Sequence, residues 1–221
     1  MSVVLGFDTA TPSTAAAVLR PDGRAFEARD DPARGERPAH ASRLLGLIEE
    51  ALAEAGAGWE DVGRIAVGVG PGGFTGLRIG VATARALAQA RGLRVVAVGS
   101  LHALAAGRPD VAAVLDARRG EVFAAIWRKG RLELPPAALP PAALAERLRA
   151  LGPLPAVGDG AVRFSDELTA AGAAVPAAES PDHRISAAQV CRLGAEGDPA
   201  APETLLPDYR REPDAKPPAT L

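Results

Sequence analysis

The chain has few residues of the kinds that build disulfide frameworks and membrane spans. Its 221 residues include one cysteine, Cys191, so an intramolecular disulfide is excluded and a reducing compartment is compatible with the sequence. No apolar stretch reaches about 18 residues free of charges, and the N-terminus lacks the basic and apolar regions of a signal peptide. The net charge of −2 gives no overall basic field of the kind that nucleic acids attract. We expect a cytoplasmic protein without a membrane span.

Motifs of several enzyme classes are missing as well. None of the three histidines, His40, His102 and His183, lies four residues from another, so no helical two-histidine metal site is expected. A Gly-x-Ser-x-Gly sequence is absent, which argues against an α/β-hydrolase. Cys191 has apolar neighbours and is predicted to be a core residue rather than a nucleophile. The sequence therefore predicts no catalytic residue, no metal ligand and no cofactor.

The order of apolar runs predicts mixed sheets covered by helices, in two units. An apolar strand that ends in an aspartate occurs once in each unit, at Asp8 and at Asp116, as a weak repeat. We predict one domain over residues 1–103 and a smaller one over residues 104–221. The predicted strands are 3–8, 14–19, 24–29, 64–69, 95–98, 111–115, 121–128 and 154–157, and the predicted helices are 39–56, 75–91, 100–106, 142–150, 161–171 and 186–195.

Two proline-rich segments are predicted to lie outside these elements. The first is a linker-like surface segment marked by Pro135, Pro136, Pro140 and Pro141. The second is the tail from Pro199 onward, which we expect to be extended and partly mobile.

The most informative segment is the run from Gly70 to Gly80, which reads Gly-Pro-Gly-Gly-Phe-Thr-Gly-Leu-Arg-Ile-Gly. It joins an apolar strand to a helix, and such a junction can bind phosphate through free backbone N–H groups. However, no lysine follows as in a Walker A loop, and no acid ends the next strand as in a dinucleotide site. We favour a tight turn whose glycines let backbone approach backbone, and phosphate binding remains the alternative.

The helix after this turn carries small residues at every fourth position, namely Gly76, Gly80, Ala84 and Ala88. A ridge of small residues lets a second helix approach closely. A neighbouring apolar stripe that includes Leu77 is predicted to face the sheet, so the helix has two packing faces. The second face needs either another helix of the chain or another subunit, and we favour the subunit.

Asp8 and Asp116 raise the question of a nucleotide site. In actin- and hexokinase-like ATPases, each of two related domains has a hairpin whose backbone holds ATP phosphates and whose acid helps place Mg²⁺ and water. Here a proline, which lacks an N–H group, follows the first acid at position 12, and Arg118 and Arg119 crowd the second. We favour acids that stabilise turns, and we take Asp8, Thr9 and Asp116 as candidates for a vestigial nucleotide site.

Together, five motifs in this order resemble the bacterial TsaB (YeaZ) family, and they extend through nearly the whole chain. The Gly70–Gly80 run is the most specific of them. Two departures are mild, because Gly73 stands where serine is common and Phe123 where tyrosine is common. The motifs are Phe7-Asp8-Thr9-Ala10-Thr11, His40-Ala41-Ser42, the Gly70–Gly80 run, Leu115-Asp116-Ala117-Arg118-Arg119-Gly120-Glu121-Val122-Phe123 and Pro207-Asp208-Tyr209-Arg210.

The resemblance implies an α/β fold of two actin-like (ASKHA, RNase H-like) domains with mixed sheets flanked by helices. It implies a non-catalytic scaffold that binds and stabilises the catalytic subunit TsaD, with the ATPase TsaE completing the complex. That complex forms N6-threonylcarbamoyladenosine (t6A) at position 37 of tRNAs reading ANN codons, and the tRNA is an indirect partner. The same helices would form the TsaD heterodimer or a homodimer. The implied interface residues are His40, Leu44, Gly76, Leu77, Gly80, Ala84 and Ala88.

Two other functions stay open from the residues alone. One is a weak ATPase or small-molecule kinase of the actin-like superfamily that uses Asp8 and Asp116. The other is a metalloprotease, against which the missing metal and nucleophile motifs argue.

Overall fold

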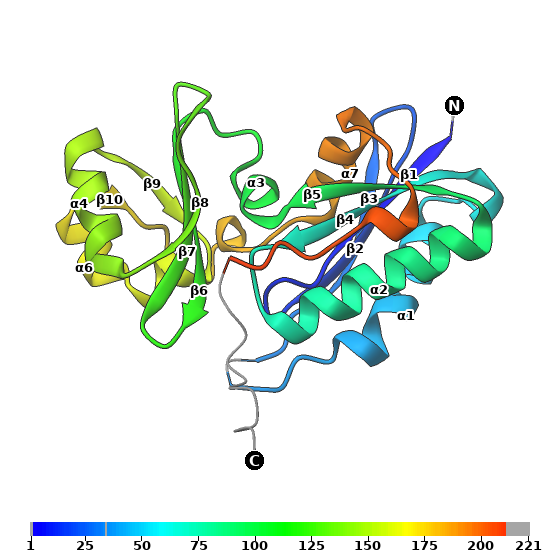
Figure 1. The fold of residues 1–221 in the computed structure, drawn as a ribbon, viewed down its shortest axis with the longest axis horizontal. Helices are drawn as coiled ribbons and strands as arrows, with labels where there is room; N and C mark the ends of the chain where they lie inside the picture. Colours follow the sequence, from blue (N-terminus) through cyan, green and yellow to red (C-terminus); the bar gives the residue numbers. More distant parts are fainter. Residues whose placement is uncertain (1, 34, 211–221) are drawn as a thin grey trace, which may run out of the picture.

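Two five-stranded mixed sheets, each in its own lobe, form the computed structural model, which describes residues 2–33 and 35–210 (Figure 1). The first sheet has the order β3-β2-β1-β4-β5, and the second has the order β10-β9-β6-β7-β8. The strands are β1 (Val3–Asp8), β2 (Thr14–Leu19), β3 (Ala25–Asp30), β4 (Val62–Gly70), β5 (Arg94–Gly99), β6 (Val111–Arg118), β7 (Glu121–Arg128), β8 (Arg131–Leu139), β9 (Leu154–Val157) and β10 (Ala173–Ala174).

The two sheets repeat one topology. In each, three consecutive antiparallel strands are followed by two strands that lie parallel to the first, β4 and β5 beside β1, and β9 and β10 beside β6. Read from β8, the second sheet therefore matches the first strand for strand. This confirms the predicted mixed α/β fold and gives the weak sequence repeat at Asp8 and Asp116 a structural basis.

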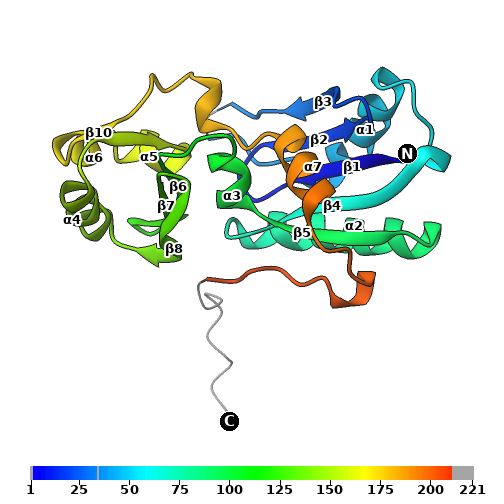
Figure 2. The same ribbon diagram turned by 90° about the horizontal axis from the view of Figure 1, so that it is seen from above.

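Helices cover both faces of the first sheet. Leu5 and Phe7 of β1 pack in a cluster with residues of α1 and α2, whereas the alternate residue Val4 packs in a cluster with residues of α7 on the other face (Figure 2). This explains why all six residues of β1 are buried and apolar residues do not alternate with polar ones along it. The helices are α1 (His40–Glu54), α2 (Phe74–Arg91), α3 (Ser100–Ala105), α4 (Pro141–Leu151), α5 (Asp159–Arg163), α6 (Ser165–Ala170) and α7 (Ala187–Glu196), with 3-10 turns at Trp59–Asp61, Pro181–His183 and Pro202–Thr204.

Cys191 of α7 is a core residue, as predicted. Its Sγ lies 3.3 Å from the carbonyl oxygen of Ala17 and 3.5 Å from that of Val4. Burial raises the pKa of this thiol far above its usual value, so the thiolate needed for nucleophilic chemistry does not form at neutral pH.

The expected linker near Pro135 is wrong. Residues Arg131–Leu139 form β8, which pairs with β7 at the edge of the second sheet. A proline cannot donate a backbone hydrogen bond, but an edge strand has one side that needs no partner strand. The helix predicted over 161–171 is also divided, into α5 and α6 on either side of Phe164.

After the second sheet, the chain returns to the first lobe. Glu27 of β3 accepts hydrogen bonds from the hydroxyl of Ser186 (2.7 Å) and the N–H of Ala188 (3.0 Å), at the start of α7. Further on, Ala200 exchanges backbone hydrogen bonds with Val95 of β5. The division of the chain into domains at residue 103 stays a prediction. Residues after position 103 nevertheless form hydrogen bonds with β3 and β5 of the first sheet.

His40 joins α1 to the first sheet. Its side chain is buried, and its Nδ1 lies 2.8 Å from the hydroxyl oxygen of Thr14 at the start of β2. Burial lowers the pKa of His40, and the nearby carboxylate of Asp30 opposes that shift. The neutral imidazole is therefore favoured by the fold.

We expect Glu27→Gln to lower the free energy of unfolding by about 1 kcal/mol, because a carboxylate at a helix N-terminus stabilises it by charge as well as by hydrogen bonding. Urea unfolding of both proteins measures the difference. Glu50→Gln on the exposed side of α1 is the matched control and should change stability by less than about 0.5 kcal/mol. Equal losses in the two variants would contradict the role of Glu27.

We also expect part of the stability to depend on the protonation of His40. Because the folded pKa lies below the ordinary value of 6.5, this contribution is complete above pH 6.5 and is lost as the pH falls toward the folded pKa. As the pH is lowered from 8 to 5, the free energy of unfolding measured with urea should therefore fall less for His40→Asn than for the unchanged chain. The control is His102→Asn, at an exposed histidine. An unchanged pH profile in His40→Asn would contradict the assignment.

Candidate functional site

The loop between β1 and β2 packs against the glycine-rich run of residues 70–80. The N–H of Gly73 donates a hydrogen bond to the carbonyl oxygen of Ala10 at 2.7 Å. A Cβ atom at Gly72 would collide with the same carbonyl, and one at Gly76 would collide with the carbonyl of Thr9. The glycines of the run therefore allow a close approach of backbone to backbone, as the sequence predicts. The segment that approaches them is the β1–β2 loop of the same chain.

Thr9 completes this contact with its side chain. Its hydroxyl donates a hydrogen bond to the carbonyl oxygen of Gly76 at 2.8 Å, and both groups are buried. A Cβ atom at Gly80 would collide with that hydroxyl. Thr9 therefore holds the loop against α2, and the small residues of α2 make room for it.

The predicted ridge of small residues faces inward in this structure. His40 and Leu44 of α1 are buried, and so are the five predicted interface residues of α2, Gly76, Leu77, Gly80, Ala84 and Ala88. The partner of the ridge is therefore the chain's own first lobe. Which residues of α1 and α2 contact another protein stays a prediction, and only exposed residues of those helices are available for it.

Asp8 lies at the meeting point of three elements. Its Oδ1 accepts a hydrogen bond from the N–H of Ala10 at 2.7 Å, and its Oδ2 accepts one from the hydroxyl of Ser100 at 2.7 Å. The Ser100 oxygen in turn accepts from the N–H of Gly70 at 3.2 Å. The carboxylate also lies over Gly68, where any side chain would collide with it. Asp8 thus ties the ends of β1 and β4 to the start of α3.

Asp8 is buried, with an exposed fraction of 3%. Burial raises its pKa, while the hydrogen bonds from Ser100 and Ala10 act in the opposite direction. Ser100 is the first residue of α3, and its hydroxyl donates the hydrogen bond to Asp8.

Asp116 is engaged in a different way. Its Oδ2 lies 2.7 Å from the guanidinium of Arg163, and its Oδ1 accepts a hydrogen bond from the N–H of Arg118 at 2.8 Å. The N–H of Asp116 donates a hydrogen bond to the carboxylate of Asp159 at 2.9 Å. Burial raises the pKa of Asp159. Arg163 and Asp159 have no signal in the sequence that would have linked them to Asp116, because they lie more than forty residues away.

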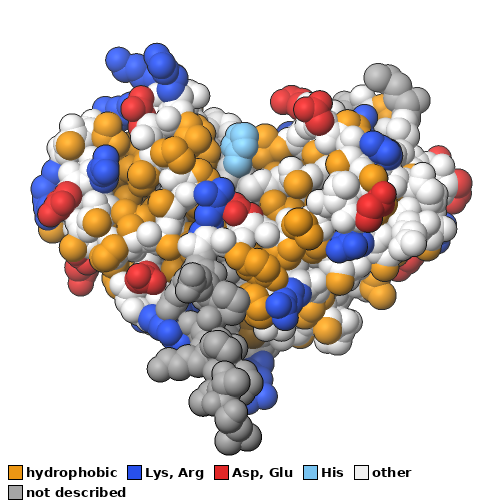
Figure 3. All heavy atoms as spheres, viewed as in Figure 1, with side chains coloured by type: hydrophobic (Ala, Val, Ile, Leu, Met, Phe, Trp, Pro, Cys, Tyr) orange, Lys and Arg blue, Asp and Glu red, His pale blue; other side chains and the backbone are white. Residues whose placement is uncertain are grey.

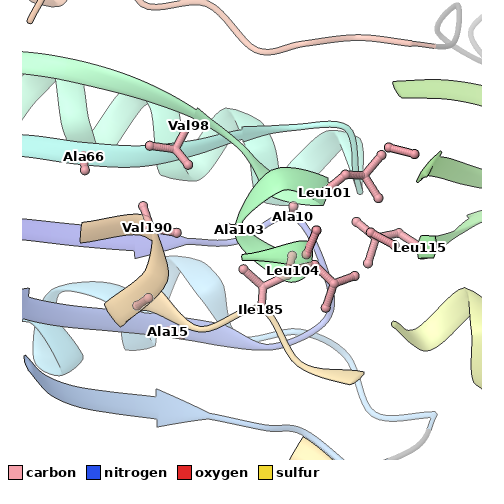
Figure 4. Packing of buried hydrophobic residues seen from close by; sticks show 14 of the residues in the cluster. Ala10, Ala15, Ala66, Val98, Leu101, Ala103, Leu104, Leu115, Ile185 and Val190 are labelled. Atoms are coloured by element: carbon pink, nitrogen blue, oxygen red, sulfur yellow. The ribbon is translucent and has the colours of Figure 1, made fainter. Parts of the chain in front are cut away.

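An apolar cluster lies where α3 meets β6, between the two lobes (Figure 4). Leu101 and Leu104 of α3 point toward Leu115 of β6, and Ala10 and Ile185 close the cluster on the other sides (Figure 4). All five are at most 4% exposed. A cavity of about 530 Å³ lies elsewhere, along β5 beside His102, and one of about 460 Å³ lies beside α6. Neither of these two cavities is lined by Asp8, Thr9 or Asp116.

Within residues 2–33 and 35–210, no group of three or more His, Cys, Asp or Glu side chains is arranged to hold a metal ion. The helices of that part of the chain also include none that is long and apolar enough to cross a membrane. The face seen in Figure 3 carries acidic and basic side chains interspersed, without a continuous field of one sign.

One exposed feature was missed at the level of sequence. Phe74 and Arg78, in the first turns of α2, contact Tyr209 of the C-terminal segment, residues 199–210. The motif around Tyr209 was noted for its resemblance to a family, but nothing in its spacing indicated which residues it would contact.

Comparisons with known proteins agree with this geometry. Residues 35–147 match the family model described as "TsaD: tRNA N6-adenosine threonylcarbamoyltransferase". An uncharacterized protein from Mycobacterium tuberculosis is 36% identical, and the alignment covers 98% of this chain and 95% of that protein. The tRNA threonylcarbamoyladenosine biosynthesis protein TsaB from Escherichia coli is 32% identical, over 78% of this chain and 80% of the relative.

Solved structures support the same relationship. YeaZ from Pseudomonas aeruginosa superposes with a TM-score of 0.79 at 32% identity, covering 95% of this chain and all of that one. A ROK hexokinase from Thermus thermophilus has a TM-score of 0.50 at 15% identity and shows the shared actin-like fold alone. The named relatives, the fold and the motif residues agree, and the chain therefore belongs to the TsaB (YeaZ) family.

Proposed function

We propose that this chain is a non-catalytic scaffold subunit that binds and stabilises TsaD. The complex would form t6A at position 37 of tRNAs reading ANN codons in the cytoplasm. Two findings support a role in this pathway, namely the family model for TsaD and the biosynthetic name of the E. coli relative. TsaE would complete the complex, and the tRNA would be bound chiefly by the other subunits.

The proposal that the subunit is not catalytic rests on the packing of apolar side chains between the two lobes. An actin-like ATPase holds phosphates and Mg²⁺ between two hairpins, so it needs an open cleft and free acids at that place. Here Leu101 and Leu104 of α3 and Leu115 of β6 pack in one apolar cluster between the lobes (Figure 4), and they are at most 2% exposed. Asp8 is hydrogen-bonded to Ser100, and Asp116 is paired with Arg163. A nucleotide that bound through either acid would have to replace these interactions.

The surface that we assign to TsaD is the outer face of α1 and α2. Leu45 of α1 is 54% exposed and Phe74 of α2 is 39% exposed, and both are apolar side chains on adjacent helices. An exposed apolar side chain favours protein association more than an isolated polar one. We name this surface the two-helix face, and its exposed residues are Ala41, Leu45, Gly46, Phe74, Arg78, Ala82 and Ala86. A homodimer through the same face is expected when TsaD is absent.

We expect Leu45→Arg or Ala82→Trp to weaken TsaD binding about tenfold or more, because each places a bulky or charged group at the centre of the two-helix face. Titration calorimetry with purified TsaD measures the dissociation constant. Leu132→Arg is the control, since Leu132 is 47% exposed on β8 in the other lobe. A pull-down from native cells should recover TsaD and TsaE with the unchanged chain. Unweakened binding in both face variants would contradict the assigned surface, and no TsaD binding by the unchanged chain would contradict the function.

We expect no binding of ATP with Mg²⁺ at a micromolar dissociation constant, because Asp8 is buried and hydrogen-bonded to Ser100 and Asp116 is paired with Arg163. Calorimetry on the isolated chain measures this directly. Micromolar binding that is lost in both Asp8→Asn and Asp116→Asn, with both variants folded by circular dichroism, would establish the alternative of a weak ATPase or kinase.

A further inference from the structure

The C-terminal segment packs closely on the first lobe. After the backbone exchange between Ala200 and Val95, the side chain of Leu205 is only 3% exposed, and the N–H of Asp208 donates to the carbonyl of Val69 at 2.7 Å. The carbonyl oxygen of Asp208 lies against Gly70, where a Cβ atom would be 3.1 Å away. In Figure 1 this segment, coloured red, runs along α2. It brings Tyr209 to the first turn of that helix.

Tyr209 then joins Phe74 and Arg78 in a cluster of two aromatic rings and a guanidinium, which we name the Tyr209 cluster. The guanidinium carbon of Arg78 lies 3.8 Å from the centre of the Phe74 ring. The Nε–H of Arg78 donates to the hydroxyl of Tyr209 at 3.1 Å. The rings of Phe74 and Tyr209 are 5.1 Å apart at an angle of 34°. Each member of the cluster therefore contacts both others.

The cluster is exposed although it is ordered by these contacts. Phe74 is 39% exposed and Tyr209 is 42% exposed. Tyrosine and arginine are enriched among the residues that dominate binding energy, and side chains already held in place lose less entropy when a partner covers them. In the described part of the chain, no carboxylate forms an ion pair with Arg78. A bound partner can therefore supply a carboxylate that pairs with Arg78.

The cluster is continuous with the two-helix face. Phe74 and Arg78 are the first two of a row of exposed residues at every fourth position of α2, continued by Ala82 and Ala86. Residues at this spacing lie on one side of a helix. A protein that covers this row would reach Tyr209 without leaving the surface.

We propose that the partner bound to the two-helix face also covers the Tyr209 cluster, and that it meets the cluster with an apolar pocket and a carboxylate. This inference rests on the proposed function and commits to a TsaD-type protein as the occupant. Arg210, the basic residue that follows Tyr209, is paired with Asp208 at 2.7 Å, so of the two arginines at positions 78 and 210 the described structure leaves only the guanidinium of Arg78 without a carboxylate. One guanidinium is too little for a nucleic-acid backbone, which proteins bind through several cations. The C-terminal segment is thus part of the binding surface.

The test compares Tyr209→Ala with Tyr209→Phe in the full chain, using the dissociation constant for purified TsaD. We expect about tenfold weaker binding in Tyr209→Ala and about threefold weaker binding in Tyr209→Phe, which keeps the ring and removes the hydrogen bond to Arg78. Arg78→Ala should weaken binding and reduce its dependence on salt, since it removes the charge. Leu132→Ala in the other lobe is the control and should bind as the unchanged chain does.

A second measurement needs no variant. Hydrogen exchange of the unchanged chain should slow in peptides covering residues 205–210 when TsaD is added. Unchanged exchange there, or unweakened binding by a folded Tyr209→Ala, would overturn the inference while leaving the proposed function intact. Weakened self-association with unaltered TsaD binding would assign the cluster to a second copy of this chain and overturn the chosen occupant. If the unchanged chain does not bind TsaD, the proposed function fails, and this inference fails with it.

Discussion

The close approach of the β1–β2 loop to α2 determines the geometry of the first lobe. The carbonyl groups of Thr9 and Ala10 occupy the space that side chains at Gly72 and Gly76 would need. Because the helix and the loop touch through backbone atoms, α2 lies closer to the sheet than larger residues would allow. A single methyl group at Gly76 would force the two backbones apart, so the whole arrangement depends on hydrogen atoms at these positions.

The same approach determines what Asp8 does. The loop turns directly after this residue, and its N–H at Ala10 bonds back to the carboxylate. The other carboxylate oxygen then accepts from Ser100, which fixes the first residue of α3. α3 places Leu101 and Leu104 between the lobes. An acid that an ATPase of this fold would direct into an open cleft is here part of the contact that fills it, which supports the proposal that the subunit is not catalytic.

Much of this architecture could be predicted from local patterns. The uninterrupted apolar residues of β1, the acids that follow the apolar residues of β1 and β6, and the glycines at a strand-to-helix junction are all local signals, each contained within a few residues. They predicted the mixed sheets and the tight turn correctly. The topological repeat was visible only as two strands ending in aspartate, and the structure extends it to five strands in each sheet.

What could not be predicted depends on contacts between distant residues. The proline pair at 135–136 reads as a linker because propensity does not reveal that β8 lies at an edge. Helical spacing placed Gly76, Gly80 and Ala84 on one ridge, but it does not say whether the loop at Thr9 or another protein covers that ridge. Likewise, the partners of Asp116 and the position of Tyr209 follow from the fold and not from spacing.

The buried ridge and the exposed row of α2 are nevertheless related. Phe74 and Gly76 differ by two positions, which is about 200° around a helix, so the row at 74, 78 and 82 lies opposite the ridge at 76, 80 and 84. Close contact on the buried side holds the helix firmly, and this fixes the outer side as well. A surface held in this way loses little conformational entropy when a partner binds it. Gly76 and Gly80 therefore contribute to the proposed interface without touching the partner, because they let α2 pack closely on its own lobe and so order the exposed residues on the opposite side of the helix.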